Sequence, residues 1–497
     1  MKKRWHATIP CSMPAIVLAT LNARHAHASL GLRCLLANLG PLAAEATLME
    51  FTIARPAAEI VEAILLAKPR IVGLGVYIWN VVQTTEVVAL LKTVAPEVTV
   101  VLGGPEVSHE TDAQPIVQLA DHVITGWGEV SFRVLCEGLL SGQAPAQRII
   151  PGVQPPLNDL RLPYALYTEA DIAHRFLYVE ASRGCPYKCE FCLSALDRTA
   201  WAFPQEDFLA ALDDLHRRGA RHFRFVDRTF NLNVKTSLRI LEFFLARLDE
   251  RLFLHFEVIP DHLPEALKAA LARFPPGSLQ LEIGVQTFDP AVQALISRRQ
   301  DNARTEENLR WLRAHTHAHL HVDLIAGLPG EDLAGFGAGF DRLVRLKPHE
   351  IQVGLLKRLR GAPIVRHTET FGLRFNPHPP YEILATDRIS FTDMRRLARF
   401  ARYWDLLGNS GRLPRTLPLL LGEAPFARFL ALSDWLWQTT QQTHGFALER
   451  LFGLVQEGLT RVLGVAPDAV RDALAQDGVG LQHGGHRVPG LEHLTAI

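Results

Sequence analysis

The chain has 497 residues, of which 48% are hydrophobic and 21% charged, as in ordinary globular proteins. Lysine plus arginine and aspartate plus glutamate both number 52, and this balance argues against a surface for nucleic acid. The most apolar segment, Leu417–Trp437, contains Glu423, Arg428 and Asp434, which argues against a membrane span. We therefore expect a cytoplasmic protein with reduced thiols, a small-molecule substrate and domains of about 150 residues each.

The first 148 residues alternate short apolar runs with helical stretches, which predicts a doubly wound α/β domain around a parallel sheet. Ligands of such sheets bind at the carboxyl ends of the strands. A proline-rich connector, Pro151–Pro156, marks the boundary with the next domain. The expected strands are Ala15–Leu21, Ala46–Phe51, Ile71–Tyr77, Val98–Leu102 and His122–Thr125.

The loops that follow these strands are rich in glycine and polar residues, and glycine lets a backbone approach a bulky ligand closely. A Rossmann-like nucleotide-binding domain is one interpretation, although no GxGxxG motif opens the first helix. The candidate ligand-binding residues are Asn22, Arg24, Tyr77, Trp79, Asn80, Gly103, Gly104, Pro105, Glu106, Ser108, Gly126, Gly128 and Glu129.

Three of the six cysteines, Cys185, Cys189 and Cys192, lie within eight positions in the spacing CxxxCxxC. Thiolates are the soft ligands that iron–sulfur clusters require, and three of them leave one iron of a four-iron cluster open for chemistry. Zinc is the alternative, but a closed zinc site needs a fourth ligand, and the next histidine is the distant His216. The remaining cysteines are expected to be ordinary buried thiols: Cys11, Cys34 and Cys136.

This cysteine motif resembles the signature of the radical S-adenosylmethionine (SAM) enzymes. The resemblance implies a [4Fe-4S] cluster whose open iron chelates SAM, and an external electron donor of the flavodoxin or ferredoxin type. Strands and helices alternate again from Phe176 to about Arg366, which predicts the partial (β/α)6 TIM barrel expected of that superfamily. The six expected strands are Phe176–Glu180, His222–Val226, Phe253–Val258, Leu279–Val285, His321–Ile325 and Glu350–Leu355.

Polar residues at the ends of these strands are candidate SAM ligands. Asp227, with Thr229 beside it, stands where the superfamily usually has a GGE-like element that grips the SAM amino group, although the two glycines are missing here. Glu257 and Gln286 suit the ribose hydroxyls or the amino acid end of SAM.

The run Ile325-Ala326-Gly327-Leu328-Pro329-Gly330-Glu331 resembles the superfamily's GxIxGxxE element, which packs against adenine. Ile325 and Gly327 are therefore candidate SAM contacts, whereas Glu331 equally fits a cap of the next helix. Tyr187 and Phe191 in the cysteine loop are suited to shielding the cluster and touching adenine, and simple packing explains them equally well.

With the cysteines downstream, the GGPE and GxGE elements of the first domain resemble the cobalamin-binding domain that precedes many radical SAM domains. The resemblance implies a cobalamin that lies over the strand ends. The D-x-H-x-x-G motif of the other large cobalamin family is absent, although His25 and His27 occupy the first loop. The resemblance therefore implies a cobalamin without a protein histidine ligand, and Tyr77 or Trp79 is the candidate for the group beneath the corrin.

Residues 371–497 are predicted to be mainly helical, as in Phe446–Leu463, after a rigid extended linker at Asn376–Glu382. The tail His483–Arg487 is expected to be a cationic loop. The predicted order is a cobalamin domain (1–148), a radical SAM domain (149–370) and a helical domain (371–497). This order resembles bacterial cobalamin-dependent radical SAM proteins whose C-terminal domain has no assigned function.

Resemblance to the best-known members implies a C-methyltransferase. In these enzymes a 5'-deoxyadenosyl radical takes hydrogen from an unactivated carbon, and methylcobalamin delivers a methyl group to it. One alternative is a cyclase, a rearranging enzyme or an oxidising enzyme with the same cofactors. A second is a non-enzymatic cobalamin sensor, but a purely structural cluster would normally have four protein ligands.

Overall fold

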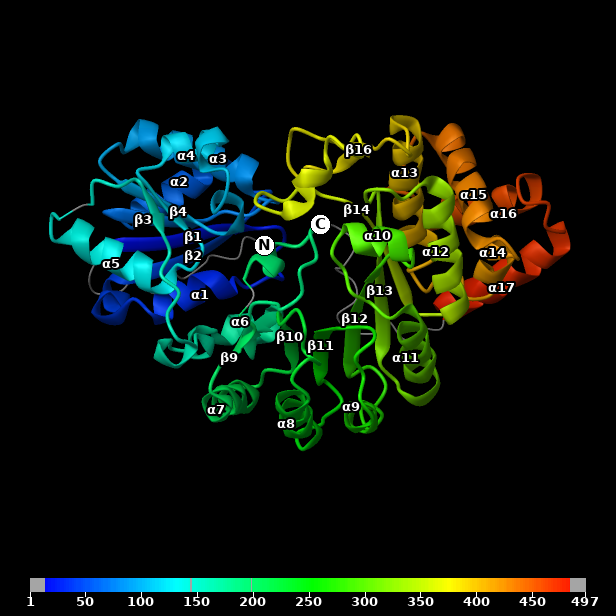
Figure 1. Ribbon diagram of the computed structural model, residues 1–497, viewed down its shortest axis with the longest axis horizontal. Coiled ribbons are helices and arrows are strands. Elements are labelled where there is room, and N and C mark those ends of the chain that lie inside the picture. The colour runs from blue at the N-terminus through cyan, green and yellow to red at the C-terminus, as the bar shows by residue number, and fades with distance from the viewer. Residues whose placement is uncertain (1–13, 144, 198, 483–497) are drawn as a thin grey trace. The chain divides into compact units, whose positions relative to one another are not determined.

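The computed structural model describes residues 14–143, 145–197 and 199–482 (Figure 1). By their internal contacts these residues form two compact units. Unit 1 comprises residues 1–183, 201–224 and 359–361, and unit 2 comprises residues 184–200, 225–358 and 362–497. The cysteine loop therefore belongs to unit 2, whereas the residues on both sides of it belong to unit 1.

Unit 1 is built on a parallel sheet whose strands follow the order β2-β1-β3-β4-β5-β6. The five expected strands are confirmed, and the start of the proline-rich connector adds β6 at the edge beside β5. Pro151 can end this strand because a proline without an N–H is tolerated at a sheet edge. The strands are β1 Ile16–Asn22, β2 Ala46–Thr52, β3 Ile71–Gly75, β4 Thr99–Gly103, β5 His122–Thr125 and β6 Ile149–Pro151.

Helices cover both faces of this sheet, which confirms the doubly wound class (Figure 1). On one face α2 (Ala57–Leu66), α3 (Val81–Val94) and α4 (Pro115–Leu119) bury apolar side chains. On the other face α1 (Leu30–Ala37) and α5 (Glu129–Leu140) do the same. Burial on both faces explains why the strands read as continuous apolar runs.

The remaining elements of unit 1 flank the cysteine loop in sequence. The two short strands β8 and β9 are antiparallel, with Arg183 opposite Trp201, so both ends of the cysteine loop are held together. The last strand, β10, ends on Phe225, which belongs to unit 2. The elements are α6 Glu169–His174, β7 Leu177–Val179, β8 Ser182–Arg183, β9 Trp201–Ala202, α7 Gln205–Arg217 and β10 His222–Phe225.

Unit 2 contains four parallel strands in the order β14-β13-β12-β11. With β7 and β10, all six strands expected for the second α/β region are present. The strands are β11 Phe253–Val258, β12 Leu279–Gln286, β13 His319–Ala326 and β14 Glu350–Leu355. The helices between and around them are α8 Val234–Leu245, α9 Glu265–Leu271, α10 Pro290–Leu295, α11 Asn302–His315 and α12 Leu333–Leu346.

The C-terminal region is helical as expected, but the expected linker at 376–382 is different. It is the turn of a short antiparallel hairpin between β15 (Arg374–Phe375) and β16 (Ile383–Ala385). The tail His483–Arg487 and Cys11 lie outside the described residues. The helices are α13 Phe391–Leu407, α14 Leu417–Leu421, α15 Pro425–Thr440, α16 Leu448–Arg461 and α17 Pro467–Gln482.

This helical region packs onto the α/β part of unit 2. Phe340 of α12 lies 5.0 Å from Phe400 and 4.9 Å from Trp404 of α13, measured between ring centroids. The side chain of Asn409 accepts a hydrogen bond from the Ile351 N–H and donates one to the Ile351 carbonyl, both at 3.0 Å. Ile351 lies in β14, so Asn409 satisfies backbone groups on a strand that would otherwise be a free edge.

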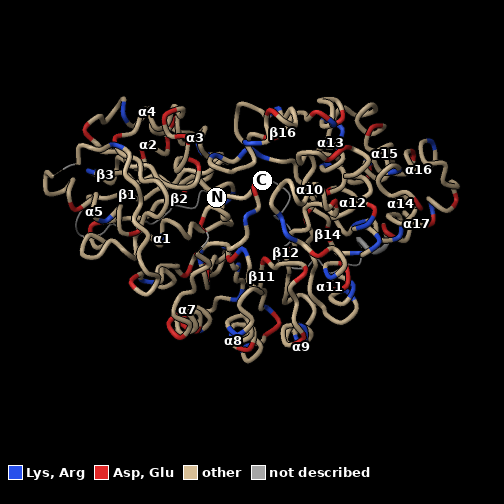
Figure 2. Tube along the Cα trace, viewed as in Figure 1, with Lys and Arg blue, Asp and Glu red and all other residues tan. Residues whose placement is uncertain are grey.

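Charged side chains of both signs are interspersed along the chain, for example on α8 and α9 (Figure 2). This distribution agrees with the balance of 52 basic and 52 acidic residues. Within the residues that the structure describes, no helix combines the length and the apolar character needed to cross a membrane.

Two glycines of α12 provide a test of this packing. A Cβ at Gly337 would lie 2.3 Å from Cδ1 of Phe426 in α15, whereas a Cβ at Gly339 would meet nothing within 4 Å. We expect Gly337→Ala to lower the free energy of unfolding by about 1–3 kcal/mol through overpacking. Gly339→Ala should raise it by about 0.5–1 kcal/mol through helix propensity. Chemical denaturation of both variants measures the difference, and equal effects would contradict the α12–α15 contact.

Candidate cofactor site

The three motif cysteines lie in one loop, with Cys185 and Cys189 buried and Cys192 half-buried. The Cys185 N–H donates to the Asp197 carbonyl at 2.8 Å, and the Cys192 N–H donates to the Cys189 carbonyl at 3.1 Å. Burial raises the pKa of the Cys185 thiol to about 11, and the other two thiols add to this rise. The three sulfur atoms are therefore within electrostatic reach of one another.

Glu190 anchors the middle of the cysteine loop. Its carboxylate is buried and accepts hydrogen bonds from Ser297 at 2.5 Å, Arg366 at 2.5 and 2.7 Å, and His367 at 2.9 Å. Its N–H donates to the Ile296 carbonyl, and its own carbonyl accepts from the Ile364 N–H. Two distant segments of unit 2 thus hold the loop between the first and third cysteines.

Arg298 was not among the residues predicted from sequence, yet it contacts a motif cysteine. Its Nη1 lies 3.6 Å from Sγ of Cys189, and its Nη2 donates to the Gly284 carbonyl. A guanidinium beside buried sulfur stabilises the thiolate form, which is the form that binds iron. The chemistry and the spacing of the three thiols therefore fit an iron–sulfur cluster. Among the described residues, no three Cys, His, Asp or Glu side chains converge as they would on a single metal ion.

The candidate SAM residues Asp227 and Thr229 lie in the turn after β10, where Asp227 is buried and Thr229 half-buried. Glu257, near the end of β11, accepts hydrogen bonds from Nη1 of Arg228 at 2.7 and 3.0 Å. Burial raises the pKa of Glu257, and the Arg228 guanidinium opposes this rise. Arg228, like Arg298, was not predicted from the sequence. Its contact with Glu257 is visible only in the structure.

Gln286 ends β12 in an unusual conformation. Its φ is 69°, in the left-handed region, and its Oε1 is buried without a hydrogen-bond partner. A Cβ at Gly284 would lie 2.4 Å from Nε2 of Gln286, so only glycine at 284 leaves room for this amide. A strained residue with an unsatisfied buried oxygen is typical of a ligand-binding position.

The IAGLPGE run follows β13. Ile325 is half-buried, and Gly327 packs against Ile383 and Met394 of the C-terminal region. Glu331 does not cap α12, because Asp332 does so by accepting from the Gly335 N–H at 2.7 Å. Instead, Glu331 is buried and accepts a 2.7 Å hydrogen bond from the Thr287 hydroxyl. In the cysteine loop, the remaining candidates are half-buried: Tyr187 and Phe191.

In unit 1 two asparagines hold the strand-end loops. The fully buried Asn80 accepts from the Tyr77 N–H at 2.8 Å and donates to the carbonyls of Leu21 and Gly75 at 3.0 and 3.1 Å. Asn22 donates to the His27 carbonyl at 2.8 Å and to Glu50 at 3.0 Å. Both predicted ligand residues therefore use their amides on the protein, and they shape the loops.

The loops after β4 and β5 are joined by a serine. The Ser108 hydroxyl donates to the Gly104 carbonyl at 2.8 Å and accepts from the Gly126 N–H at 3.0 Å. Gly104 has a φ of 111°, and a Cβ there would lie 2.5 Å from the Val76 carbonyl oxygen. Glycine at 104 thus allows the loops after β3 and β4 to touch. The neighbours Gly103, Pro105 and Gly128 belong to the same group of loops.

Both predicted acidic residues of these loops form buried ion pairs. Arg360 binds Glu106 at 2.9 Å, and Arg183 binds Glu129 at 2.6 Å. Arg183 also lies over the Trp127 ring, 4.8 Å from its centroid. Arg183 directly precedes the cysteine loop in sequence, and Arg360 follows β14. Both glutamates therefore bind arginines that follow the first α/β domain in the sequence.

The loop after β3 presents two aromatic rings. Tyr77 and Trp79 are stacked, with centroids 4.4 Å apart and an interplanar angle of 8°. A Cβ at Gly31 would lie 3.2 Å from the Tyr77 hydroxyl, so the polar end of Tyr77 points at α1. Trp79 is 38% exposed. Of the two candidates, Trp79 has the ring available to a ligand.

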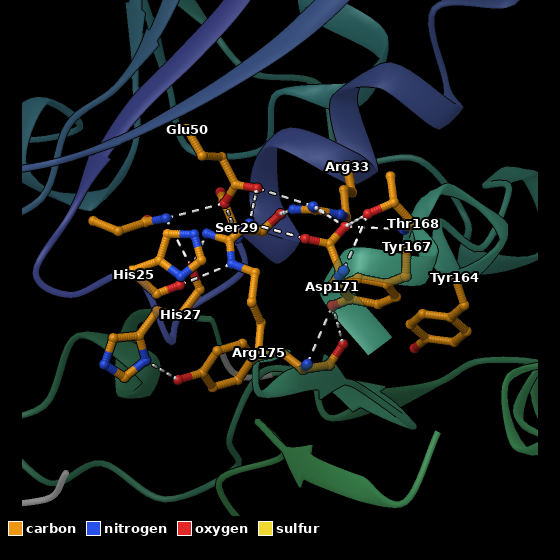
Figure 3. Close-up of polar contacts among 12 residues, drawn as sticks. His25, His27, Ser29, Arg33, Glu50, Tyr164, Tyr167, Thr168, Asp171 and Arg175 are labelled. Atoms are coloured by element: carbon orange, nitrogen blue, oxygen red, sulfur yellow. Dashed lines mark hydrogen bonds and ion pairs between the residues drawn. The ribbon is translucent and has the colours of Figure 1, made fainter. Parts of the chain in front are cut away.

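The first loop is fixed by a buried charge network (Figure 3). Arg33 binds Glu50 and Asp171, both at 2.9 Å, and Arg175 binds the same two carboxylates at 2.7 and 3.0 Å. Arg175 also donates to the His25 carbonyl at 2.9 Å. Arg24 is half-buried in this loop, which is thus held through its backbone. Together, these glycine-bearing strand-end loops and the exposed indole fit a large planar ligand such as a corrin.

Three families match successive parts of the chain. Residues 16–135 match the B12 binding domain, residues 179–338 match the radical SAM superfamily, and residues 369–487 match a protein of unknown function (DUF4080). The chain therefore joins a B12-binding region, a radical SAM region and a DUF4080 region. These matches confirm the expected cofactor classes, namely an iron–sulfur cluster, SAM and cobalamin.

A curated relative is the cobalamin-dependent radical SAM methyltransferase TokK of Streptomyces tokunonensis, which is 25% identical over 470 residues. That alignment covers 84% of this chain and 65% of TokK. Among solved structures, TsrM of Kitasatospora setae with cobalamin and a [4Fe-4S] cluster bound has a TM-score of 0.61 at 16% identity. It covers 95% of this chain and 100% of TsrM. OxsB with aqua-cobalamin gives 0.62 at 14% identity, covering 94% and 84% of the two chains.

Glu331 provides a test of the geometry after β13. Burial raises the pKa of Glu331 to about 8, so the folded protein holds this carboxyl protonated at neutral pH. The contribution of Glu331 to the free energy of unfolding is fully present below about pH 4.5 and is lost progressively as the pH rises to about 8. Glu331→Gln should therefore raise the free energy of unfolding at pH 8 by on the order of 2 kcal/mol, with little effect at pH 5. Denaturation at both pH values measures this, and an equal effect at both would contradict the neutral carboxyl.

Proposed function

We propose that this B12-binding radical SAM protein is a methyltransferase that acts on an unactivated carbon of a small molecule. The observation that carries the proposal is the three-thiol loop without a fourth motif ligand, in a chain that also has a B12-binding region. The similarity to TokK supports methyl transfer as the reaction type. When bound, the reduced cluster supplies the electron that cleaves SAM, and cobalamin supplies a transferable methyl group.

In this proposal Cys185, Cys189 and Cys192 hold the cluster, and Arg298 favours their thiolate form. Glu190 keeps the loop rigid, because a buried carboxylate with several charge-assisted hydrogen bonds is costly to displace. The proposed SAM contacts come from the cysteine loop and from four strand ends: Tyr187, Phe191, Asp227, Glu257, Gln286, Ile325 and Gly327.

The proposed cobalamin contacts lie in the strand-end loops of unit 1. Trp79 offers an indole face to the corrin without a nitrogen ligand for cobalt, since its N–H cannot donate a lone pair. A cobalamin bound beside Trp79 would receive no cobalt ligand from this side chain, which would make its reduction easier. Asn22, Asn80, Glu106 and Glu129 also hold the loops in place. The proposed cobalamin contacts besides Trp79 are Asn22, Arg24, Tyr77, Asn80, Gly103, Gly104, Pro105, Glu106, Ser108, Gly126, Gly128 and Glu129.

The test is anaerobic turnover of the protein loaded with cobalamin, iron and sulfide, with a chemical reductant and SAM. A methyltransferase that uses SAM in two ways yields both 5'-deoxyadenosine and S-adenosylhomocysteine. 5'-Deoxyadenosine alone would favour a cyclase, a rearranging enzyme or an oxidising enzyme. Neither product, with both cofactors bound, would contradict an enzymatic role and favour a cobalamin sensor.

Replacing a motif cysteine tests the cluster assignment. Cys185→Ala, Cys189→Ala and Cys192→Ala should each lower formation of 5'-deoxyadenosine at least 100-fold, because the cluster loses one of three protein ligands. Each variant should still bind cobalamin, because the proposed cobalamin loops lie in unit 1. Absorbance of the purified variants measures bound cobalamin, and Cys136→Ala is the control, since Cys136 is buried in α5. Loss of cobalamin from all three variants would refute independent binding.

Replacing Trp79 tests the position beneath the corrin. In Trp79→His an imidazole nitrogen replaces the indole, and it should bind cobalt and split the electron paramagnetic resonance lines of cob(II)alamin into triplets. The wild-type protein should show no such splitting. Leu90→His is the matched control, because Leu90 in α3 is also 38% exposed. If cob(II)alamin in Trp79→His shows no nitrogen splitting, Trp79 does not lie beneath cobalt.

A further inference from the structure

The four parallel strands of unit 2 carry polar side chains on one face, at every second residue. In register across the sheet, Glu257 of β11 pairs with Glu282 of β12, Glu282 with His321 of β13, and His321 with Glu350 of β14. Parallel strands covered by helices are normally apolar on both faces, and barrel interiors are filled by branched aliphatic residues. We call this surface the polar face; its members are His255, Glu257, Gln280, Glu282, His319, His321, Asp323, Glu350 and Gln352.

One residue of the polar face points to an absent ligand. Gln280 lies two residues before Glu282 on β12, so strand alternation places both side chains on the same face. Gln280 is fully buried, and neither its Nε2 nor its Oε1 has a hydrogen-bond partner. Its register neighbours are His255 and His319. A buried amide with no partner is rare in native proteins, because each unpaired atom loses its hydration without compensation.

One further atom of the polar face is unsatisfied. Nδ1 of His255 is buried without a hydrogen-bond partner, whereas Oδ1 of Asp323 lies 3.2 Å from Nε2 of His321. By contrast, Nε2 of His255 contacts Glu282 at 3.0 Å, and His321 contacts Glu350 and Gln352, both at 2.8 Å. The histidines are thus held in place by carboxylates, while both amide atoms of Gln280 remain to be satisfied.

The polar face carries more negative than positive charge. Its four carboxylates, Glu257, Glu282, Asp323 and Glu350, face histidines and the Arg228 guanidinium, which is bound to Glu257. Although burial opposes it, hydrogen bonding to Asp323 and Glu350 raises the pKa of His321, so His321 carries a second positive charge. Although burial opposes ionisation, hydrogen bonding to His255 lowers the pKa of Glu282 to about 2, so Glu282 is charged. Burial and the nearby Glu282 raise the pKa of Asp323 to about 6. Glu282 is 31% exposed at its side chain, so a ligand has access to it.

We propose that the polar face is a substrate subsite, and that the substrate carries a protonated amine held by Glu282 and Asp323. This inference rests on the proposed function, because it names the substrate class of the same enzyme. An ammonium group donates up to three hydrogen bonds and offsets the excess negative charge. Gln280 lies one pleat repeat, about 7 Å, from Glu282 along β12. Its side-chain amide can both donate and accept hydrogen bonds. The substrate therefore extends from its amine to an amide-like or hydroxyl-bearing group at Gln280.

Three probes with the same four-carbon chain and amide end test this chemistry. They are 4-aminobutanamide, which carries an ammonium group, butanamide, which is neutral, and succinamate, which carries a carboxylate. Saturation-transfer NMR is recorded anaerobically on the protein loaded with cluster and cobalamin, in the presence of SAM. We expect 4-aminobutanamide to bind at least tenfold more tightly than either of the other two probes.

Glu282→Gln should abolish this preference, because it removes the charge and keeps the shape. Glu306→Gln is the matched control: Glu306 of α11 is also largely buried and paired with Arg310 and Arg342, but it lies outside the polar face. A preference that is equal in the two variants overturns the proposal. A 4-aminobutanamide signal that is present without SAM and disappears when SAM is added also overturns the proposal, because SAM would then occupy the polar face.

Gln280→Met separates a ligand-binding role from a structural one. If Gln280 awaits a ligand, methionine removes an unsatisfied amide and should raise the midpoint of thermal unfolding by about 1–3 °C, while weakening 4-aminobutanamide binding at least tenfold. A fall in the midpoint with unchanged binding would assign Gln280 a structural role and overturn the proposal. 5'-Deoxyadenosine and S-adenosylhomocysteine are measured on the same wild-type sample. Formation of both products without an amine preference refutes only this inference, whereas an amine preference without these products refutes only the proposed methyl transfer.

Discussion

In a parallel sheet every strand ends at the same edge, and side chains alternate between the two faces. Both units of this chain depend on that constraint. In unit 1 it gathers the loops after β1, β3, β4 and β5 at one edge, although they come from residues 100 positions apart in sequence. In unit 2 it gathers Glu257, Gln286 and Ile325 near the ends of neighbouring strands, and it places Glu282 and Gln280 one above the other on one face. Strand alternation and register thus determine which of these side chains share a face and lie beside one another.

Buried carboxylates hold four of the loops in which the proposed ligand contacts lie. Glu190 holds the cysteine loop, Glu106 and Glu129 hold the loops after β4 and β5, and Glu50 holds the loop after β1. Each of the four binds an arginine that is distant in sequence. Removing one partner from the buried pairs of Glu50, Glu106 and Glu129 typically costs about 3–5 kcal/mol, so these loops resist rearrangement. The geometry suits chemistry with reactive intermediates, because a preorganised site does not need to reorganise when the reaction occurs.

Sequence patterns were sufficient for the classes of structure and cofactor, because strand periodicity and the CxxxCxxC spacing are local properties. They were insufficient for partners that are distant in sequence. Arg298 lies 109 residues from Cys189, and neither residue marks the other in the sequence. For the same reason the sequence placed Glu106 and Glu129 in the strand-end loops but did not indicate that Arg360 and Arg183 bind them. The hairpin at β15 and β16 was missed because prolines at 377, 379 and 380 suggested an extended chain. Its contacts with residues 356–358, which follow β14, are not visible in the local sequence.

The C-terminal region has a structural role that follows from its contacts within unit 2. Asn409 satisfies the outer edge of β14, and Ile383 and Met394 cover Gly327 in the element proposed to contact SAM. Without this cover, β14 would be an exposed edge strand, and the loop after β13 would lose its packing partner. A helical region that completes the sheet and supports one proposed cofactor contact is therefore structurally part of unit 2. The contacts of its described residues thus support β14 directly and the loop after β13 through Ile383 and Met394.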